Sequence, residues 1–242
     1  MRTAAALIIG NELLSGKIAE ANLQVLAREL RALGVRLTRV VMVLDDLEVI
    51  AREVRELSAA HDVVFTSGGV GPTHDDLTME SVARAFGAAV VLSPAIERMI
   101  RGYYAERCTD GHLLMARIPE GARLVSSDAV PWPTVVMRNV WVLPGVPEVF
   151  RMKLPHVRSE LAGDAPFLSL AVCTTLDEGD IKPLLDRVVA EHGAVEIGSY
   201  PKWHDAEYRT KLTFDGTDPV TVHAARDALL AGLPIGALVR IE

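Results

Sequence analysis

The chain has 242 residues, of which 50% are hydrophobic and 24% charged, and its formal net charge is −7. This composition excludes a disordered tail, a collagen-like fibre and a disulfide-stapled miniprotein, and it supplies enough apolar material for one large domain or two modest ones. The acidic balance, together with the lack of any Lys or Arg run, argues against a nucleic-acid partner.

Cysteine usage and hydropathy point to a compartment. Cys108 and Cys173 lie far apart without metal-type spacing, which excludes a CxxC zinc site and argues against a disulfide framework. The apolar run Ala4–Ile9 is too short for the core of a signal peptide, and no apolar segment approaches the roughly 20 residues that a bilayer-spanning helix needs. We therefore expect a cytoplasmic protein with no membrane partner.

Short apolar strands alternate with amphipathic helices at the start of the chain. The predicted order is strand 4–9, helix 17–33, strand 35–44, a helix from Leu47 capped by Asp45 or Asp46, strand 62–66, and a helix that opens at Asp76 or Thr78. Such alternation predicts an α/β fold, with a mainly parallel sheet between two layers of helices.

The pattern then changes twice. Strands are predicted over 88–92, 124–125, 134–138 and 140–143, the last two as a hairpin, and helices over 94–107, 112–115 and from Pro147 to Leu161. Residues 162–166 suit a linker, and beyond them the order is βαββαβ, which is the split ferredoxin-like arrangement. We expect two domains, 1–163 and a small α+β domain over 164–242.

A glycine-rich segment joins the third strand to the next helix. It contains Ser67, Gly68, Gly69, Val70, Gly71, Pro72 and Thr73, followed by His74, Asp75 and Asp76. Ligands usually bind at the carboxyl edge of an open α/β sheet, and glycines there let backbone N–H groups approach an anion. The following helix N-terminus favours phosphate. The segment matches neither the GxGxxG nor the P-loop pattern.

Two carboxylates lie where a phosphate would bind. Asp75 and Asp76 would repel it, and a divalent cation that bridges carboxylate and phosphate oxygens removes the conflict, with Mg²⁺ as the natural choice. Either Asp could instead be a helix N-cap worth about 1 kcal/mol. The pair beside three glycines favours the metal interpretation.

Three further strand-to-helix junctions carry polar residues or glycine. Gly10, Glu12 and Ser15 follow the first strand, and Asn22 comes one turn later. Asp45 and Asp46 follow the second strand, where helix capping is the alternative role. Gly145 and Pro147 follow the strand over 140–143. Since the ends of parallel strands meet at one edge, we expect these residues around one crevice.

These motifs carry a resemblance to a known family. GNELLSGK with Asn22, SGGVGPTHDDLT and LPGVPE together resemble the MoaB/MogA-like molybdopterin-binding domain in its competence-damage-inducible protein A (CinA) branch, over residues 3–161. GSYPKW and YRTKLTFDG in the tail resemble the segment that follows the corresponding domain of eukaryotic FAD synthases. The resemblance implies a three-layer αβα domain and a homo-oligomer.

The resemblance also implies roles for particular residues. The glycine-rich residues with Asp75 and Asp76 match the loop that binds nucleotide or pterin phosphate. Asp46, alone or together with Asp45, matches the second carboxylate, and Gly145 and Pro147 match the PGxP turn. CinA proteins are associated with metal-dependent hydrolysis of ADP-ribose, and the FAD synthase domain with hydrolysis of FAD. Val70 replaces the Thr that is typical of molybdopterin adenylyltransferases, which weakens that alternative.

The leading hypothesis is a metal-dependent nucleotide pyrophosphatase that releases AMP from ADP-ribose, FAD or a similar diphosphate. Asp46, Asp75 and Asp76 would hold a divalent Mg, Mn, Co or Ni ion, and Glu12 would be the general base. The nucleotide or phosphate would contact residues from all four junctions: Gly10, Ser15, Asn22, Ser67, Gly68, Gly69, Gly71, Pro72, Thr73, Gly145 and Pro147. The alternatives are a pterin- or nucleotide-binding module without turnover and a protein of molybdopterin-cofactor biosynthesis.

Overall fold

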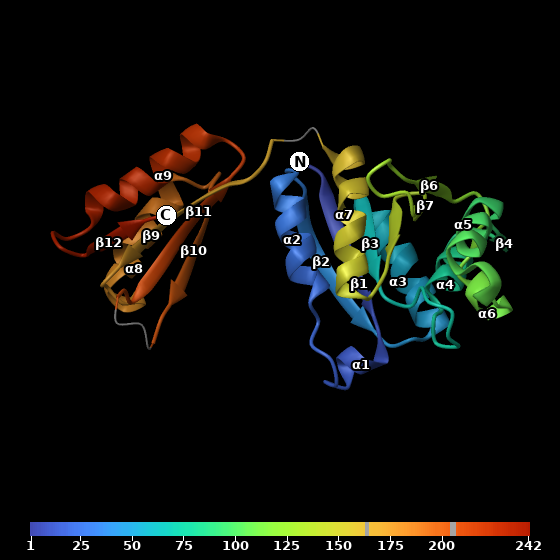
Figure 1. Cartoon of the computed structure of the whole chain (residues 1–242). Coiled ribbons are helices and arrows are strands. Elements are labelled where there is room, and N and C mark those ends of the chain that lie inside the picture. Colours follow the sequence, from blue (N-terminus) through green and yellow to red (C-terminus); the bar gives the residue numbers. More distant parts are fainter. Residues whose placement is uncertain (163–164, 204–206) are drawn as a thin grey trace. The chain divides into compact units, whose positions relative to one another are not determined.

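A computed structural model describes residues 1–162, 165–203 and 207–242 (Figure 1). The chain divides into two units, residues 1–164 and 165–242, and each is described here by itself. The domain boundary expected between residues 163 and 164 falls outside the described residues.

The first unit is built on a six-stranded sheet in the order β2-β1-β3-β8-β7-β6. Its strands are β1 (Thr3–Ile9), β2 (Arg36–Val43), β3 (Val63–Ser67), β8 (Val140–Leu143), β7 (Thr134–Met137) and β6 (Arg123–Val125). The first four in this order are parallel, and β7 pairs antiparallel with both of its neighbours, β8 and β6. The expected mainly parallel sheet is confirmed, as is the hairpin between β7 and β8.

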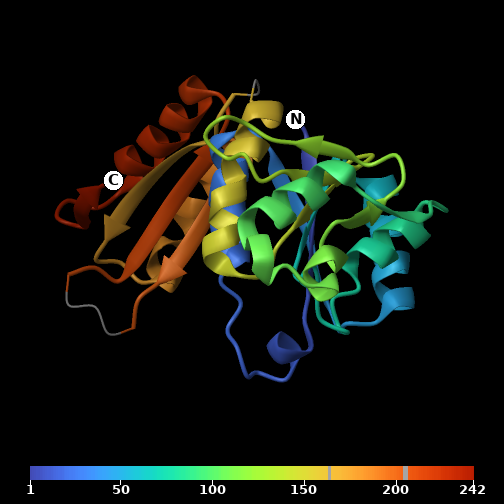
Figure 2. The ribbon, with the colours of Figure 1, turned by 45° about the vertical axis from the view of Figure 1, so that its right-hand side comes forward.

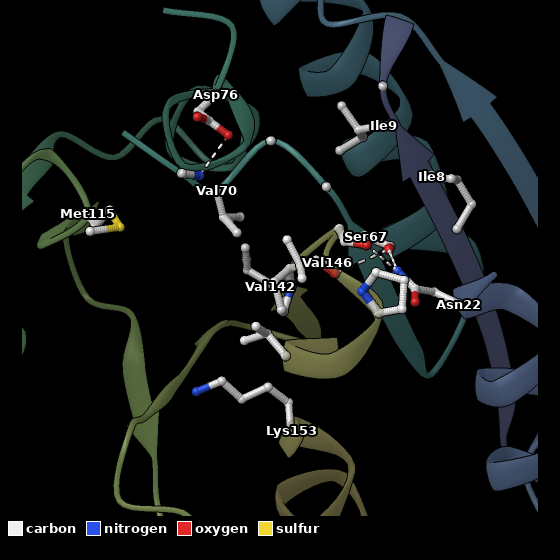
Figure 3. Close-up of a pocket in the computed structure, with 18 of the residues that line it drawn as sticks. Ile8, Ile9, Asn22, Ser67, Val70, Asp76, Met115, Val142, Val146 and Lys153 are labelled. Atoms are coloured by element: carbon white, nitrogen blue, oxygen red, sulfur yellow. Dashed lines mark hydrogen bonds between the residues drawn. The ribbon is translucent and has the colours of Figure 1, made fainter. Parts of the chain in front are cut away.

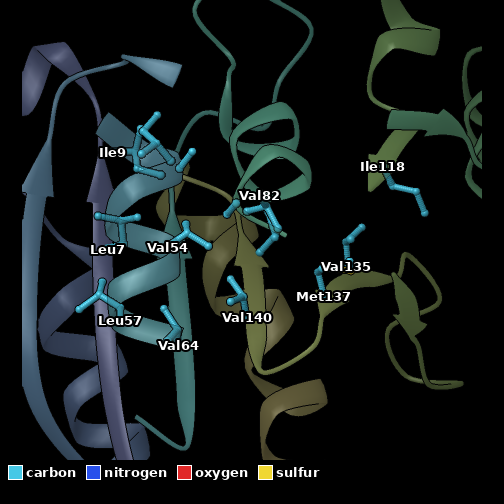
Figure 4. Packing of buried hydrophobic residues seen from close by; sticks show 14 of the residues in the cluster. Leu7, Ile9, Val54, Leu57, Val64, Val82, Ile118, Val135, Met137 and Val140 are labelled. Carbon is cyan, nitrogen blue, oxygen red and sulfur yellow. The ribbon is translucent and has the colours of Figure 1, made fainter. Parts of the chain in front are cut away.

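Alternate residues of β1 enter two separate cores. Ala5, Leu7 and Ile9 pack in one cluster, whereas Ala4, Ala6 and Ile8 pack in the other. Helices α3 (Leu47–Ala60) and α4 (Thr78–Ala85) cover the first face, where Figure 4 shows the packing. Helices α2 (Asn22–Ala32) and α7 (Pro147–Leu161) lie together on the second face (Figures 1 and 2). Burial on both faces explains the continuous apolar run of β1.

The helix expected over 17–33 begins later than predicted. A short helix α1 (Asn11–Leu14) follows β1, Gly16 turns the chain at φ 72°, and α2 begins at Asn22. The Glu20 carboxylate accepts hydrogen bonds from the backbone N–H groups of Asn22 and Leu23, at 2.7 and 2.9 Å. These bonds satisfy N–H groups that a helix start leaves unpaired, and they fix its position.

Further elements complete the first unit on the side of β6 and β7. Strands β4 (Val90–Leu92) and β5 (Arg117–Pro119) form a separate antiparallel pair, of which β5 was not predicted. Between them lie α5 (Pro94–Tyr104), a 3-10 turn over Ala105–Arg107 and α6 (Asp110–Leu114). This segment supplies one wall of the cavity described below.

The second unit has the expected βαββαβ order. Its elements are β9 (Leu168–Thr174), α8 (Glu178–Glu191), β10 (Glu196–Pro201), β11 (Thr210–Gly216), α9 (Pro219–Gly232) and β12 (Leu238–Ile241). The strands form one antiparallel sheet in the order β10-β11-β9-β12. Its helices pack on a core that includes Val172, Phe214 and Leu229. Across the described parts of both units, no helix combines the length and apolarity needed to span a bilayer.

Candidate functional site

The ends of three central strands meet at one edge of the sheet. Strand β1 leads into Gly10, β3 into Gly68 and β8 into Pro144, and the Gly68 N–H donates to the Leu143 carbonyl oxygen at 3.2 Å. The buried Asn22 amide donates to the Ser67 hydroxyl at 3.0 Å and to the Gly145 carbonyl oxygen at 2.8 Å. Asn22 therefore joins three of the four junctions identified in the sequence.

Close backbone approaches shape the glycine-rich loop. Gly68 has φ 111°, and a Cβ atom there would lie 2.1 Å from the Ile9 carbonyl oxygen. A Cβ atom at Gly145 would lie 3.2 Å from the Gly68 Cα atom. The buried Thr78 fastens the loop, because its hydroxyl donates to the Gly68 carbonyl oxygen at 2.8 Å and its N–H donates to the Gly69 carbonyl oxygen at 3.0 Å. Gly68 is therefore the position that only glycine fits, while a side chain at Gly145 would press on the Gly68 backbone. Thr78 is a supporting residue that the motif reasoning missed.

The loop offers fewer free N–H groups than its glycines suggest. The Gly68 N–H is bonded to Leu143, and the Gly71 N–H donates to Asp76 Oδ1 at 2.6 Å. The N–H groups of Gly69 and Val70 have no hydrogen-bond acceptor among the described residues. These two donors are therefore available to a phosphate oxygen.

The two adjacent aspartates have different surroundings. Asp76 Oδ2 accepts from the Thr73 N–H at 2.8 Å and from its hydroxyl, so both Asp76 oxygens are engaged by the loop itself. The half-exposed Asp75 accepts from the Thr73 hydroxyl at 2.6 Å, and this hydrogen bond lowers the pKa of the Asp75 carboxyl. Asp76 thus orders the loop, while Asp75 stays ionised and accessible.

The adjacent residues Asp45 and Asp46 have different roles in the structure. Asp46 Oδ1 accepts from the N–H groups of Glu48 and Val49, both at 3.0 Å, so Asp46 is the N-cap of α3 and lies outside the cavity lining. The metal-binding and catalytic role expected of Asp46 does not fit this placement. Asp45, and not Asp46, lines the cavity, and its carboxylate accepts a hydrogen bond from the Asn11 N–H at 2.8 Å.

Asp45 lies in an acidic neighbourhood. Burial raises the pKa of the Asp45 carboxyl, and the nearby charges of Glu12, Asp75 and Asp76 raise it further, against the opposing hydrogen bond from Asn11. Carboxylates from three junctions therefore interact electrostatically across the cavity rim. Such mutual repulsion is relieved by a cation or by proton uptake.

The acidic residues form no preassembled metal cage. Among the described residues, no group of three or more His, Cys, Asp or Glu side chains is placed to hold a metal ion. Mg²⁺ in nucleotide sites usually takes one or two carboxylates and completes its shell with water and substrate phosphates. Asp45 and Asp75, which both line the cavity, offer oxygen donors of the kind that this mode of binding uses.

These residues surround a cavity of about 830 Å³ within the first unit (Figure 3). Most of the expected site residues line it: Gly10, Glu12, Asn22, Ser67, Gly68, Gly69, Gly71, Thr73, Asp75, Asp76, Gly145 and Pro147. Ser15 and Pro72 do not, and Ser15 instead donates to the Glu12 carbonyl oxygen at 3.1 Å. A cavity of this size accommodates a ligand larger than a mononucleotide.

The apolar part of the cavity lining was not predicted. Side chains from segments that carry no motif line the cavity as well: Ile96, Tyr104, Met115, Trp132, Val142 and Lys153. Figure 3 shows Lys153 at the far end of the cavity from Asp76, with Val142 between them. One available sequence signal was the position of Lys153, three residues after Phe150 on the buried face of α7.

Comparison with known proteins identifies the class. Residues 5–161 match the family model described as "Probable molybdopterin binding domain", the MoaB/Mog domain, and residues 166–242 match "FAD synthase, middle domain". The chain therefore belongs to the molybdopterin-binding domain family and carries the FAD synthase middle domain behind it.

Individual relatives refine this assignment. The "Probable FAD synthase" of Caenorhabditis elegans is 32% identical over 255 residues, covering 94% of this chain and 49% of the relative. A "CinA-like protein" of Desulfosudis oleivorans is 38% identical over 155 residues, covering 61% of this chain and 38% of the relative. The chain thus spans about half or less of the length of these curated relatives.

A solved structure supports the same fold. The protein CinA from Thermoplasma acidophilum is similar at a TM-score of 0.61 and 30% identity, over 67% of this chain and all of that one. The expected resemblance to the CinA branch and to FAD synthase is confirmed.

Proposed function

We propose that the chain is a metal-dependent nucleotide pyrophosphatase that hydrolyses an ADP-containing diphosphate such as FAD or ADP-ribose and releases AMP. The observation that carries the proposal is a single large cavity in which free loop N–H groups, carboxylates from three junctions and an apolar compartment meet. Relatives named FAD synthases make a diphosphate of this class, and this similarity supports a nucleotide-related role.

The chain's own residues supply binding and orientation. The N–H groups of Gly69 and Val70 are free to donate to a phosphate oxygen, and the N-terminus of α4 adds a partial positive charge. Asp45 and Asp75 would hold a divalent cation, which, when bound, neutralises developing charge on the phosphate oxygens and lowers the pKa of water. Glu12 lines the same cavity and would accept a proton from the attacking water.

The proposal is tested by turnover. FAD, ADP-ribose, NADH and CoA are each incubated with the chain and Mg²⁺, Mn²⁺, Co²⁺ or Ni²⁺, and AMP release is measured by chromatography. We expect metal-dependent AMP release from at least one substrate, its loss in Asp45→Asn, and its retention in Glu56→Gln, which removes an exposed carboxylate on α3. Asp76→Asn is a poorer test, since it also removes the loop's hydrogen bonds.

A binding module without turnover is the second candidate. The engagement of both Asp76 oxygens by the loop, together with the lack of a preassembled three-residue metal cluster among the described side chains, favours it. Calorimetry decides between the two: tight binding of FAD or of a pterin, with no AMP released under any metal, supports the module and rules out the pyrophosphatase.

A further inference from the structure

A lysine lies at the apolar end of the cavity. Lys153 is on the buried face of α7 and is only 5% exposed. Its ammonium group donates to the carbonyl oxygens of Trp132 and Pro133, at 2.5 and 2.9 Å. These bonds tie the helix to the segment that forms one wall of the cavity.

Among the residues that the structure describes, no carboxylate pairs with Lys153. It is the only Lys, Arg or His side chain among the described residues that line the cavity, and its two recorded acceptors are neutral carbonyls. An ammonium group has three N–H donors, so one remains after these two bonds. Burial lowers the pKa of Lys153 to about 8, which reflects how poorly the charge is solvated there. A buried donor of this kind favours a ligand that brings an acceptor.

The surroundings of Lys153 restrict what that ligand can be. Trp132 and Pro133, whose carbonyl oxygens accept from Lys153, and Val149, one helical turn before it on α7, also line the cavity, so the compartment suits a flat apolar ring more than a hydrated sugar or a phosphate dianion. Planar heterocycles of the flavin and pterin kind carry ring carbonyl oxygens, whereas adenine carries none.

We propose that Lys153 is a specificity-determining residue that donates a hydrogen bond to a ring carbonyl oxygen of a planar heterocycle bound at the apolar end of the cavity. The inference deepens the proposed function, because it assigns the non-adenylate half of the diphosphate substrate to the class of carbonyl-bearing rings. It does not depend on turnover, since ring binding requires neither the metal nor the diphosphate.

The test uses riboflavin, which has the ring but no phosphate, and AMP, which has the phosphate but no ring carbonyl. Affinities of both probes are measured on the whole chain by fluorescence and by calorimetry, without metal. Lys153→Met is compared with Arg151→Met, which removes a positive charge from an exposed position of the same helix. We expect Lys153→Met to weaken riboflavin binding roughly tenfold to hundredfold and AMP binding less than twofold, as the loss of one hydrogen bond to a charged group implies.

Other outcomes overturn the assignment. The role proposed for Lys153 is wrong if Lys153→Met leaves the riboflavin affinity unchanged. It is also wrong if the unmodified chain does not bind riboflavin. Equal weakening of riboflavin and AMP shows that Lys153 only supports the cavity wall. Lys153→Gln keeps a side-chain N–H donor and should recover part of the riboflavin affinity, and a thermal unfolding midpoint within a few degrees of the parent shows that each variant is folded. If no AMP is released from FAD, ADP-ribose, NADH or CoA under any metal while riboflavin binding still depends on Lys153, only the proposed function is overturned.

Discussion

The Asn22 side-chain amide donates to the Gly145 carbonyl oxygen across 2.8 Å, although 123 residues separate the two in the chain. The same amide nitrogen also donates to the Ser67 hydroxyl, so one buried side chain holds the ends of β3 and β8 in place. The Asn22 Oδ1 atom is buried and has no partner in the described structure. Asn22 lines the cavity, next to the candidate ligand-binding residues of the glycine-rich loop.

Replacement of Asn22 by alanine should loosen the site. The change leaves the Gly145 carbonyl oxygen and the Ser67 hydroxyl without this donor, and we expect a loss of about 1–3 kcal/mol in the free energy of unfolding. Urea unfolding measures it, and AMP affinity should fall in parallel. Gln24→Ala, an exposed change in the first turn of the same helix, should alter neither quantity. Equal behaviour of the two variants would contradict the role given to Asn22.

Asp45 and Asp46 should separate activity from stability. Burial and acidic neighbours raise the pKa of Asp45, so the folded state binds a proton more tightly there than the unfolded state does. The stability contributed by this group is therefore present at low pH and is lost as pH rises through the raised pKa. Asp45→Asn should thus raise the free energy of unfolding at pH 7 while it abolishes AMP release.

Asp46→Ala should show the reverse pattern. It removes the α3 cap, which costs about 1 kcal/mol of stability, and leaves the cavity lining intact. Urea unfolding and an AMP-release assay on both variants check the pair. If Asp46→Ala loses AMP release but keeps normal stability, Asp46 is a metal-binding residue after all.

Gly68→Ala should disrupt the loop severely. The new methyl group would lie 2.1 Å from the Ile9 carbonyl oxygen, and φ 111° is strained for alanine. We expect a loss of more than about 2 kcal/mol in stability and no measurable AMP binding. Gly87→Ala is the matched control, because Gly87 also has a positive φ of 67° but a methyl group there meets nothing within 4 Å. If the two variants have comparable unfolding curves, the close approach of Gly68 to the Ile9 carbonyl oxygen is contradicted.

Lys153 should give the stability of the first unit a distinctive pH dependence. Its pKa of about 8 lies below the ordinary value of 10.5, so between these pH values the unfolded chain holds a proton that the folded chain has released. The free energy of unfolding should therefore rise across this window, by up to about 3 kcal/mol, relative to Lys153→Met. Denaturant unfolding of both proteins at pH 7, 8.5 and 10 measures the difference. A constant difference over this range would show that Lys153 titrates normally.

The sheet and its loops could be predicted from local sequence patterns, because each of these elements has a characteristic residue type. The continuous apolar run of β1 predicted a central strand, and the glycines before α4 predicted the loop at its end. The start of α2 was placed too early, since the apolar spacing begins only at Leu23. The hydrogen bonds that the Glu20 carboxylate accepts from the N–H groups at the helix start have no strong sequence signature. The sequence could not show whether Asp45 or Asp46 caps α3, because an aspartate is an equally good N-cap at either position.

The apolar half of the cavity could not be predicted from the motifs. Tyr104, Met115, Trp132 and Lys153 come from four segments that meet only in the tertiary structure, and none belongs to a recognisable pattern. Lys153 and His156 both interrupt the apolar face of α7, and of these two only Lys153 lines the cavity. A charged residue at such a position is a usable signal for a buried functional lysine.

The strand order has a consequence for how the protein is made. Strand β3 ends at Ser67, yet its neighbour β8 begins only at Val140, and α7, which supplies Lys153, follows later still. During synthesis the ribosome must therefore deliver more than seventy further residues before β3 gains its second partner. Until then one long edge of the nascent sheet stays open, and we expect this interval to be the stage at which the protein most needs chaperone protection.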